Sequence, residues 1–197
     1  MTVETTIRSF LAIDPPEEIR REIGRIQNRL KKTVRGDVRW VRPESIHLTL
    51  KFFGDVRPEV IENISAVAGK AAAEVGPFEL AIGGAGVFPD RNRPRVVWLG
   101  MDGEVERLAS FQRGLERTLA EIGFPAEARH FRPHFTLGRI RSPRGPSGLA
   151  EALEQTQTDA GAKFTATGLC LFKSDLTPLG AVYTRLAVYP FAGEKTG

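Results

Sequence analysis

The chain has 197 residues, 41% of them hydrophobic, which is enough apolar material for one core of ordinary domain size. Its single cysteine, Cys170, excludes an internal disulfide bond and is typical of proteins of the reducing cytosol. We find no signal-peptide pattern and no run of about 20 apolar residues that could span a bilayer. We therefore expect one cytoplasmic domain over residues 1–197. The net charge of +4 favours an anionic partner.

The chain opens with a predicted strand and a predicted amphipathic helix. Ile7–Ile13 is a short run rich in β-branched and aromatic residues, which predicts a strand. Asp14, two prolines and Glu17 then form a capping-box spacing, so we expect Asp14 to cap a helix. The buried stripe predicted for this helix consists of Ile19, Ile23, Ile26 and Leu30.

The rest of the chain predicts further strands and helices with short connections. In chain order we expect strands over Val38–Val41 and Ile46–Phe53, a helix from Pro58, strands over Phe78–Phe88 and Arg95–Met101, a helix over Val105–Leu119, a strand over Pro133–Ile140, a helix over Leu149–Gln155, and strands over Phe164–Phe172 and Ala181–Tyr189. Short turns between strands favour antiparallel pairing. This order therefore predicts an α+β fold rather than a doubly wound parallel sheet.

Two of the three histidines stand in the same four-residue frame. His47-Leu48-Thr49-Leu50 and His134-Phe135-Thr136-Leu137 both read histidine, apolar residue, threonine, leucine, 87 positions apart. Because side chains alternate between the faces of a strand, each motif places its histidine and threonine on one face and its apolar residues on the other. Each motif therefore predicts a strand with one side in the core and an imidazole–hydroxyl pair on the opposite side.

Two such strands facing a shared cleft would suit a phosphate diester. One imidazole can remove a proton, the other can supply one, and the two hydroxyls can bind phosphoryl oxygens. We expect no metal and no cofactor. A zinc site built from the three histidines lacks support, because the sequence has no cysteine cluster, no HExxH motif and no carboxylate–histidine spacing.

The chain resembles the two-histidine (2H) phosphoesterases, and within them the LigT/ThpR group of RNA 2′,3′-cyclic phosphodiesterases, first described as 2′–5′ RNA ligases. The resemblance covers nearly the whole chain. It is carried by Arg8–Ile13, Trp40–Phe52, Pro94–Gly100, Phe131–Arg139, Ser174–Leu176 and Tyr183. It implies a two-lobed α+β fold, mostly of antiparallel sheets, with pseudo-twofold symmetry and one motif in each lobe facing a central cleft.

The same resemblance implies an activity and a role for each motif residue. The implied reaction is metal-independent hydrolysis of RNA 2′,3′-cyclic phosphate ends to 2′-phosphomonoesters. His47 would donate a proton to the leaving 3′ oxygen, and His134 would accept one from water. Thr49 and Thr136 would bind the phosphoryl oxygens. The implied partners are RNA with a 2′,3′-cyclic phosphate end or cyclic nucleotides, with no membrane and no obligatory protein partner.

Four further residues are candidate substrate contacts. Lys51 lies an even step from His47, so strand alternation predicts that it faces the cleft. Arg139 lies an odd step from His134 and would point away unless the strand is bulged. Tyr183 is a candidate for stacking on a base, and Arg91, in the proline-rich loop 89–94, for holding an RNA backbone.

Three other functions remain open on the sequence. The same site could act as a 2′–5′ RNA ligase, since one site must catalyse a reaction in both directions. The chain could instead be a module that binds nucleotide or RNA phosphates without turnover, although such a module would not require both histidines. It could also act on small cyclic nucleotides instead of RNA ends.

Overall fold

The computed structural model describes residues 5–142, 145–156, 161–178 and 180–193 of the chain. Its strands are β1 (Ile7–Ile13), β2 (Val38–Trp40), β3 (Leu48–Val56), β4 (Phe78–Phe88), β5 (Val96–Gly103), β6 (His134–Ile140), β7 (Lys163–Ala166), β8 (Gly168–Thr177) and β9 (Gly180–Pro190). Its helices are α1 (Glu17–Thr33), α2 (Pro58–Ala73), α3 (Val105–Glu121) and α4 (Leu149–Thr156), with a 3-10 turn η1 (Pro43–Ser45). The predicted α+β class is confirmed. None of the helices in these ranges is long and apolar enough to cross a membrane.

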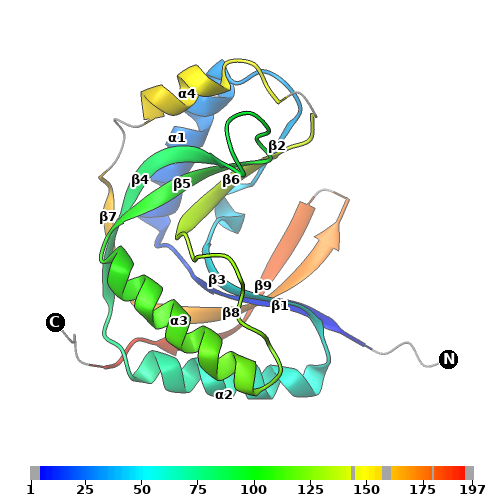
Figure 1. The fold of residues 1–197 in the computed structure, drawn as a ribbon, viewed down its shortest axis with the longest axis vertical. Helices are drawn as coiled ribbons and strands as arrows, with labels where there is room; N and C mark the ends of the chain where they lie inside the picture. Colours follow the sequence, from blue (N-terminus) through cyan, green and yellow to red (C-terminus); the bar gives the residue numbers. More distant parts are fainter. Residues whose placement is uncertain (1–4, 143–144, 157–160, 179, 194–197) are drawn as a thin grey trace.

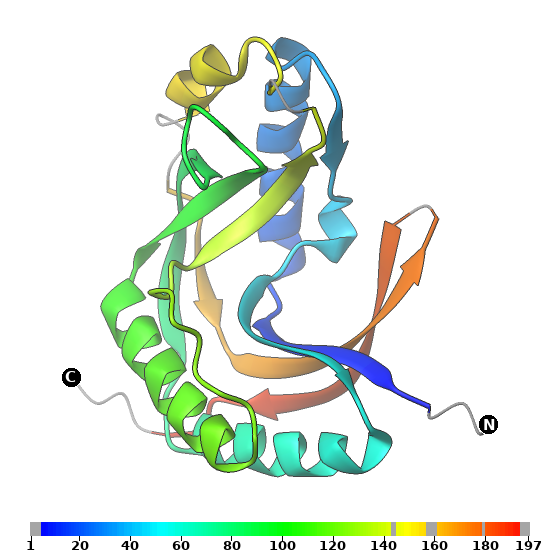
Figure 2. The same cartoon turned by 45° about the vertical axis from the view of Figure 1, so that its right-hand side comes forward.

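The strands form one continuous antiparallel sheet that curls strongly (Figures 1 and 2). Their order is β7-β4-β5-β6-β3-β1-β8-β9, and β2 adds a further pairing to β6. The two motif strands, β3 and β6, therefore lie beside each other at the centre of this order, with three strands beyond each of them. This arrangement has the pseudo-twofold character that the family resemblance implied, but in a single sheet rather than in separate ones.

Two pairs of helices cover the two ends of the curled sheet. Helices α1 and α4 pack against each other, and α4 packs on β4 (Figure 1). Helices α2 and α3 form the other pair, and α2 packs on β8 and β9 (Figure 2). The predicted stripe of α1 (Ile19, Ile23, Ile26 and Leu30) is confirmed, because each of these side chains is at most 2% exposed.

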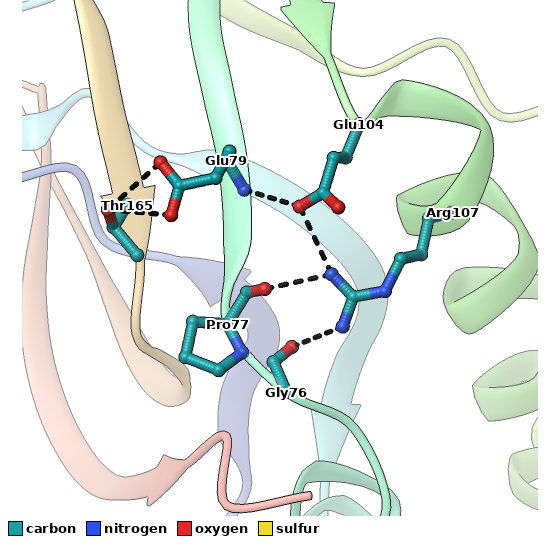
Figure 3. A network of polar contacts seen from close by, with 6 residues as sticks. All are labelled: Gly76, Pro77, Glu79, Glu104, Arg107 and Thr165. Atoms are coloured by element: carbon teal, nitrogen blue, oxygen red, sulfur yellow. Dashed lines mark hydrogen bonds and ion pairs between the residues drawn. The ribbon is translucent and has the colours of Figure 1, made fainter. Parts of the chain in front are cut away.

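Helix α3 is tied to the sheet at its first turn by a network of polar contacts (Figure 3). The Glu104 carboxylate accepts hydrogen bonds from the Glu79 backbone N–H at 2.7 Å and from Arg107 at 3.1 Å. The Arg107 guanidinium also donates to the carbonyl oxygens of Pro77 and Gly76, at 2.8 and 2.7 Å. The start of α3 is therefore fixed against β4 and the segment that leads into it.

Two local predictions are wrong. Asp14 does not cap α1; the N-cap is Pro16, without a side-chain hydrogen bond, and the Asp14 carboxylate pairs with Arg20 and Arg185 instead. The single strand predicted over Phe164–Phe172 is two strands. Its apolar pattern continues across the break at Thr167, but β7 pairs with β4 whereas β8 pairs with β1 and β9.

Candidate active site

The two motifs are direct neighbours in the sheet. Leu48 of β3 pairs with Phe135 of β6 in an antiparallel register, and both side chains are fully buried. His47 immediately precedes β3, and continuing this register by one residue in each direction would set His47 opposite Thr136 and Thr49 opposite His134. Residues directly opposite each other share a face, and diagonal neighbours in a regular ladder lie about 7–8 Å apart. The pairing thus brings both imidazoles and both hydroxyls to one face.

The His47 imidazole lies in an aromatic layer on that face. Its ring stacks on Phe10 and Phe172, with centroid distances of 4.7 and 5.3 Å, and meets the edge of the Tyr183 ring at 4.7 Å. Burial lowers the pKa of His47 to about 4, while the nearby Asp14 carboxylate raises this pKa and Arg20 lowers it. The free protein therefore holds His47 neutral at pH 7.

His134 has a different environment, with a fixed tautomer. Its Nδ1 lies 2.6 Å from the Arg132 carbonyl oxygen. A carbonyl oxygen only accepts, so Nδ1 carries the hydrogen and Nε2 of the neutral ring holds a lone pair. Burial lowers the pKa of His134, the hydrogen bond to Arg132 raises it, and the Arg139 charge lowers it. The edge of the ring also contacts Phe88, at a centroid distance of 5.0 Å.

The two motif threonines present their hydroxyls on the same face. Thr49 is exposed and Thr136 is half-buried. Neither hydroxyl has a hydrogen-bond partner among the described residues. Both are therefore available to donate to an anionic oxygen.

The prediction that Lys51 faces the cleft is wrong, and a β-bulge is the reason. Thr49 pairs with Ala12 of β1 but Lys51 pairs with Leu11, so Leu50 is an extra residue in β3. A bulge of this kind reverses the alternation beyond it. Lys51 consequently lies on the core side, 4% exposed, where its Nζ is 2.9 Å from Glu116 Oε2 and 2.7 Å from the Pro125 carbonyl oxygen.

An equivalent bulge in β6 turns Arg139 onto the motif face, which is the face of the sheet that carries the two motif histidines and the two motif threonines. Trp98 of β5 pairs with Thr136 but Val97 pairs with Gly138, which leaves Leu137 as the extra residue. Arg139 is exposed, and its charge lowers the pKa of both His134 and Tyr183. The strand is therefore bulged, as it has to be if Arg139 is to face the site.

Sequence reasoning missed a second arginine beside Arg139. Arg39 of β2 stands directly opposite Arg139 of β6 in the ladder, and both side chains are exposed. Residues opposite each other share a face, and like charges in this position repel. A bound anion would relieve the repulsion. Only the pairing of β2 with β6 reveals this arginine pair, because nothing in the local sequence relates the two positions.

The other candidate residues lie in different places. Tyr183 of β9 packs edge-on against both His47 and Phe10, so it belongs to the aromatic layer around the first histidine. Arg91 is exposed in the loop between β4 and β5, which is held by the Asp90 carboxylate accepting from the backbone N–H groups of Asn92 and Arg93. The sheet register therefore unites the two motifs with Arg139 and Tyr183, whereas Lys51 is turned away.

A groove of about 510 Å³ opens beside His134. Its aromatic and basic lining comes from Phe88, Trp98, Phe131 and Arg132, and Gly83, Gly84 and Gly100 line it as well. Asp102 and Glu106 add two carboxylates. Within the described ranges, no three histidine, cysteine, aspartate or glutamate side chains gather into a group that could hold a metal ion.

The sequence matches the model of the LigT like Phosphoesterase family twice, over residues 13–98 and 99–183. Each matched stretch contains one histidine motif. Together the two stretches cover most of the chain, which therefore belongs to this family.

Named relatives and solved structures agree with this assignment. The chain is 39% identical over 183 residues to the RNA 2′,3′-cyclic phosphodiesterase of Methanothermobacter thermautotrophicus, covering 93% of this chain and 98% of the relative. Its fold matches the crystal structure of TT0787 of Thermus thermophilus with a TM-score of 0.78 and 28% identity, over 95% of this chain and 100% of that one. It also matches E. coli LigT complexed with 3′-AMP, with a TM-score of 0.71 and 27% identity, over 94% and 98% of the two chains.

Proposed function

We propose that this chain hydrolyses 2′,3′-cyclic phosphate ends of RNA to 2′-phosphomonoesters, without a metal ion. The observation that carries the proposal is the pairing of Leu48 with Phe135, which sets the two histidine–threonine pairs on one face of adjacent strands. The relatives named RNA 2′,3′-cyclic phosphodiesterases support the choice of substrate. We further propose the cytosol as its compartment, since the buried thiol of Cys170 is free.

The reaction follows from the states of the two imidazoles. Nε2 of neutral His134 accepts a proton from water, whose oxygen forms a new bond to phosphorus. The bond from phosphorus to the 3′ oxygen breaks, and the proton on that oxygen comes from His47. Thr49 and Thr136 donate hydrogen bonds to the phosphoryl oxygens. Charge-assisted bonds of this type contribute about 1.5–3 kcal/mol each.

His47 must acquire a proton before it can act as the acid, because the free protein holds it neutral at pH 7. The cyclic phosphate is an anion, and an opposite charge within about 4–6 Å raises the pKa of an imidazole. Substrate binding therefore charges His47 at the point where its proton is needed. Asp14, which already raises the pKa of His47, assists in the same direction.

The proposal is tested with an oligonucleotide that ends in a 2′,3′-cyclic phosphate, incubated with and without EDTA. We expect equal rates in both conditions and a 2′-phosphate as the product. Loss of turnover in EDTA would contradict a metal-independent reaction, and a 3′-phosphate would show that the other P–O bond breaks. Adding an RNA with a free 5′-hydroxyl end tests the 2′–5′ ligase alternative. Binding without turnover would support a non-catalytic module.

The pH dependence of the rate follows from the lowered pKa values of both histidines. An imidazole with a lowered pKa loses its proton at a lower pH, and kcat/KM reports the free enzyme. We expect a bell-shaped kcat/KM profile with both limbs below about 6.5, the ordinary pKa of histidine, and one limb near 4. The alkaline limb of kcat should lie higher, because the bound anion raises the pKa of His47.

Initial rates between about pH 3.5 and 9, at low and at saturating substrate, measure both profiles. A kcat/KM optimum above pH 7 would show that the imidazoles are not held neutral. The control is the residual activity of His47→Ala, in which the limb that reports His47 should be missing.

Arg139 is expected to bind the substrate rather than to transfer protons. Replacing it by methionine keeps most of the side-chain length and removes the charge that faces the site. We expect KM for the cyclic-phosphate oligonucleotide to rise by about 10–100-fold, which corresponds to about 1.5–3 kcal/mol for a hydrogen bond to a charged group. Steady-state kinetics at two salt concentrations measure the effect, which should shrink at high salt.

The matched control for this variant is Arg113→Met, which removes an exposed arginine from α3. It should leave KM unchanged. Equal KM values for the Arg139 and Arg113 variants would remove Arg139 from the substrate site.

A further inference from the structure

Two buried glutamines lie on α1 and α3, the two longest helices among the described residues. Gln27 of α1 is 0% exposed and Gln112 of α3 is 6% exposed. Burying an amide costs stability unless its donors and acceptor are satisfied. The hydrogen-bond partners of these two amides therefore indicate which part of the backbone the glutamines hold in place.

Each glutamine donates a hydrogen bond to the carbonyl oxygen at the bulge of a motif strand. Gln27 Nε2 lies 3.0 Å from the Leu137 oxygen of β6, and Gln112 Nε2 lies 3.2 Å from the Leu50 oxygen of β3. These leucines are the fourth residues of the two motifs, and they are the extra residues of the two bulges. Both bonds are buried.

The contacts cross between the two halves of the chain. Gln27 lies in the first matched stretch, 13–98, but it holds the motif of the second. Gln112 lies in the second stretch, 99–183, and holds the motif of the first. Each histidine strand is thus supported by a helix that belongs to the other half.

Further contacts lock the orientation of each amide. The second N–H of Gln27 donates to the Val41 carbonyl oxygen at 2.6 Å, and its Oε1 accepts from Lys31 at 2.7 Å. Gln112 Nε2 is also 3.2 Å from Glu116 Oε1, and Glu116 is paired with Lys51. Neither amide can turn over without breaking these contacts.

The bulges matter because they decide which side chains reach the motif face. The residue after each bulged leucine turns to the core: Lys51 in β3 and Gly138 in β6. At Gly138 a Cβ atom would lie 3.1 Å from Trp40 Cε3, so this position has little room for a side chain. The next residues, Phe52 and Arg139, are exposed.

We propose that Gln27 and Gln112 are a crossed pair of positioning residues, each fixing the bulge that aims the histidine and threonine of the opposite half. They do not touch the substrate; each acts through the backbone of the strand that carries the histidine. The kinetic part of this proposal rests on the proposed function, whereas the structural part does not.

The test replaces each glutamine by methionine, which keeps the volume and removes both donors. The chain has three histidines, so their ring resonances can be followed individually by NMR. Gln27→Met should shift the resonances of His134 and leave those of His47 in place, and Gln112→Met should do the reverse. Each variant should lower kcat by about 10–100-fold with KM within about threefold, because small misplacements of catalytic groups cost rates of this order.

The control is Thr156→Val in α4, which removes another buried hydrogen bond, from Thr156 Oγ1 to the Ala152 oxygen at 2.7 Å. It should leave kcat and all three histidine resonances unchanged. If Gln27→Met does not fold, Gln27→Glu keeps the contact with Lys31, loses the donors, and should act in the same direction.

Either of two results would overturn the proposal: kcat within twofold of the Thr156 control, or both glutamine variants shifting the same histidine. If the wild-type protein has no phosphodiesterase activity, the proposed function fails instead. The crossed NMR pattern then still decides whether the glutamines position the motifs.

Discussion

Replacing either motif histidine by alanine should lower kcat/KM on a 2′,3′-cyclic-phosphate oligonucleotide by about 10²–10⁴-fold, the usual contribution of one positioned proton-transfer group. In the proposed reaction His47 supplies the proton to the leaving oxygen and His134 removes one from water. Because both transfers serve a single displacement, the double variant should be only slightly slower than the slower single variant. Steady-state kinetics with both single variants and the double variant measure these changes in kcat/KM.

The third histidine provides the matched control. His130 is exposed in the loop before β6 and belongs to neither motif. His130→Ala should keep wild-type kinetics. Activity within tenfold of wild type in His47→Ala or His134→Ala would remove that histidine from the chemistry. Far-UV circular dichroism of each variant separates loss of chemistry from loss of fold, which is needed because His47 packs within an aromatic layer.

Replacing Lys51 by methionine should destabilise the protein severely and leave substrate affinity alone. Lys51 and Glu116 form a buried pair, with side chains 5% and 7% exposed. Removing the lysine leaves an uncompensated buried carboxylate, which costs about 3–5 kcal/mol. For a chain of this size the corresponding fall in Tm is roughly 10 °C. Thermal and urea unfolding of the Lys51→Met variant measure the loss.

A second substitution separates the buried pair from a substrate contact. Adding Glu116→Gln to Lys51→Met removes the stranded charge and should recover part of the lost stability. The surface control Lys32→Met, on the exposed side of α1, should stay within about 0.5 kcal/mol of wild type. If Lys51→Met instead kept the wild-type Tm and raised KM, Lys51 would bind the substrate after all.

Much of the fold was predictable because its signals are local. The apolar spacing of Ile19, Ile23, Ile26 and Leu30 defined the buried side of α1, and Ile7–Ile13 forms the strand that its composition indicated. The aromatic layer around His47 was not predictable in the same way. Phe10 and Phe172 meet only because β1 pairs with β8, 162 positions further along the chain.

The sequence by itself predicted which residues would carry the chemistry and determined that each motif has an apolar side and a polar side, because strand alternation acts over two or three residues. Only the tertiary structure decided that the two motifs are adjacent, since β3 meets β6 through pairing between distant segments. It also decided that Lys51 is buried and Arg139 exposed, because a bulge depends on a mismatch with the neighbouring strand. The tertiary structure also lowers the pKa values of the two motif histidines, because the burial of each ring depends on all the residues packed around it.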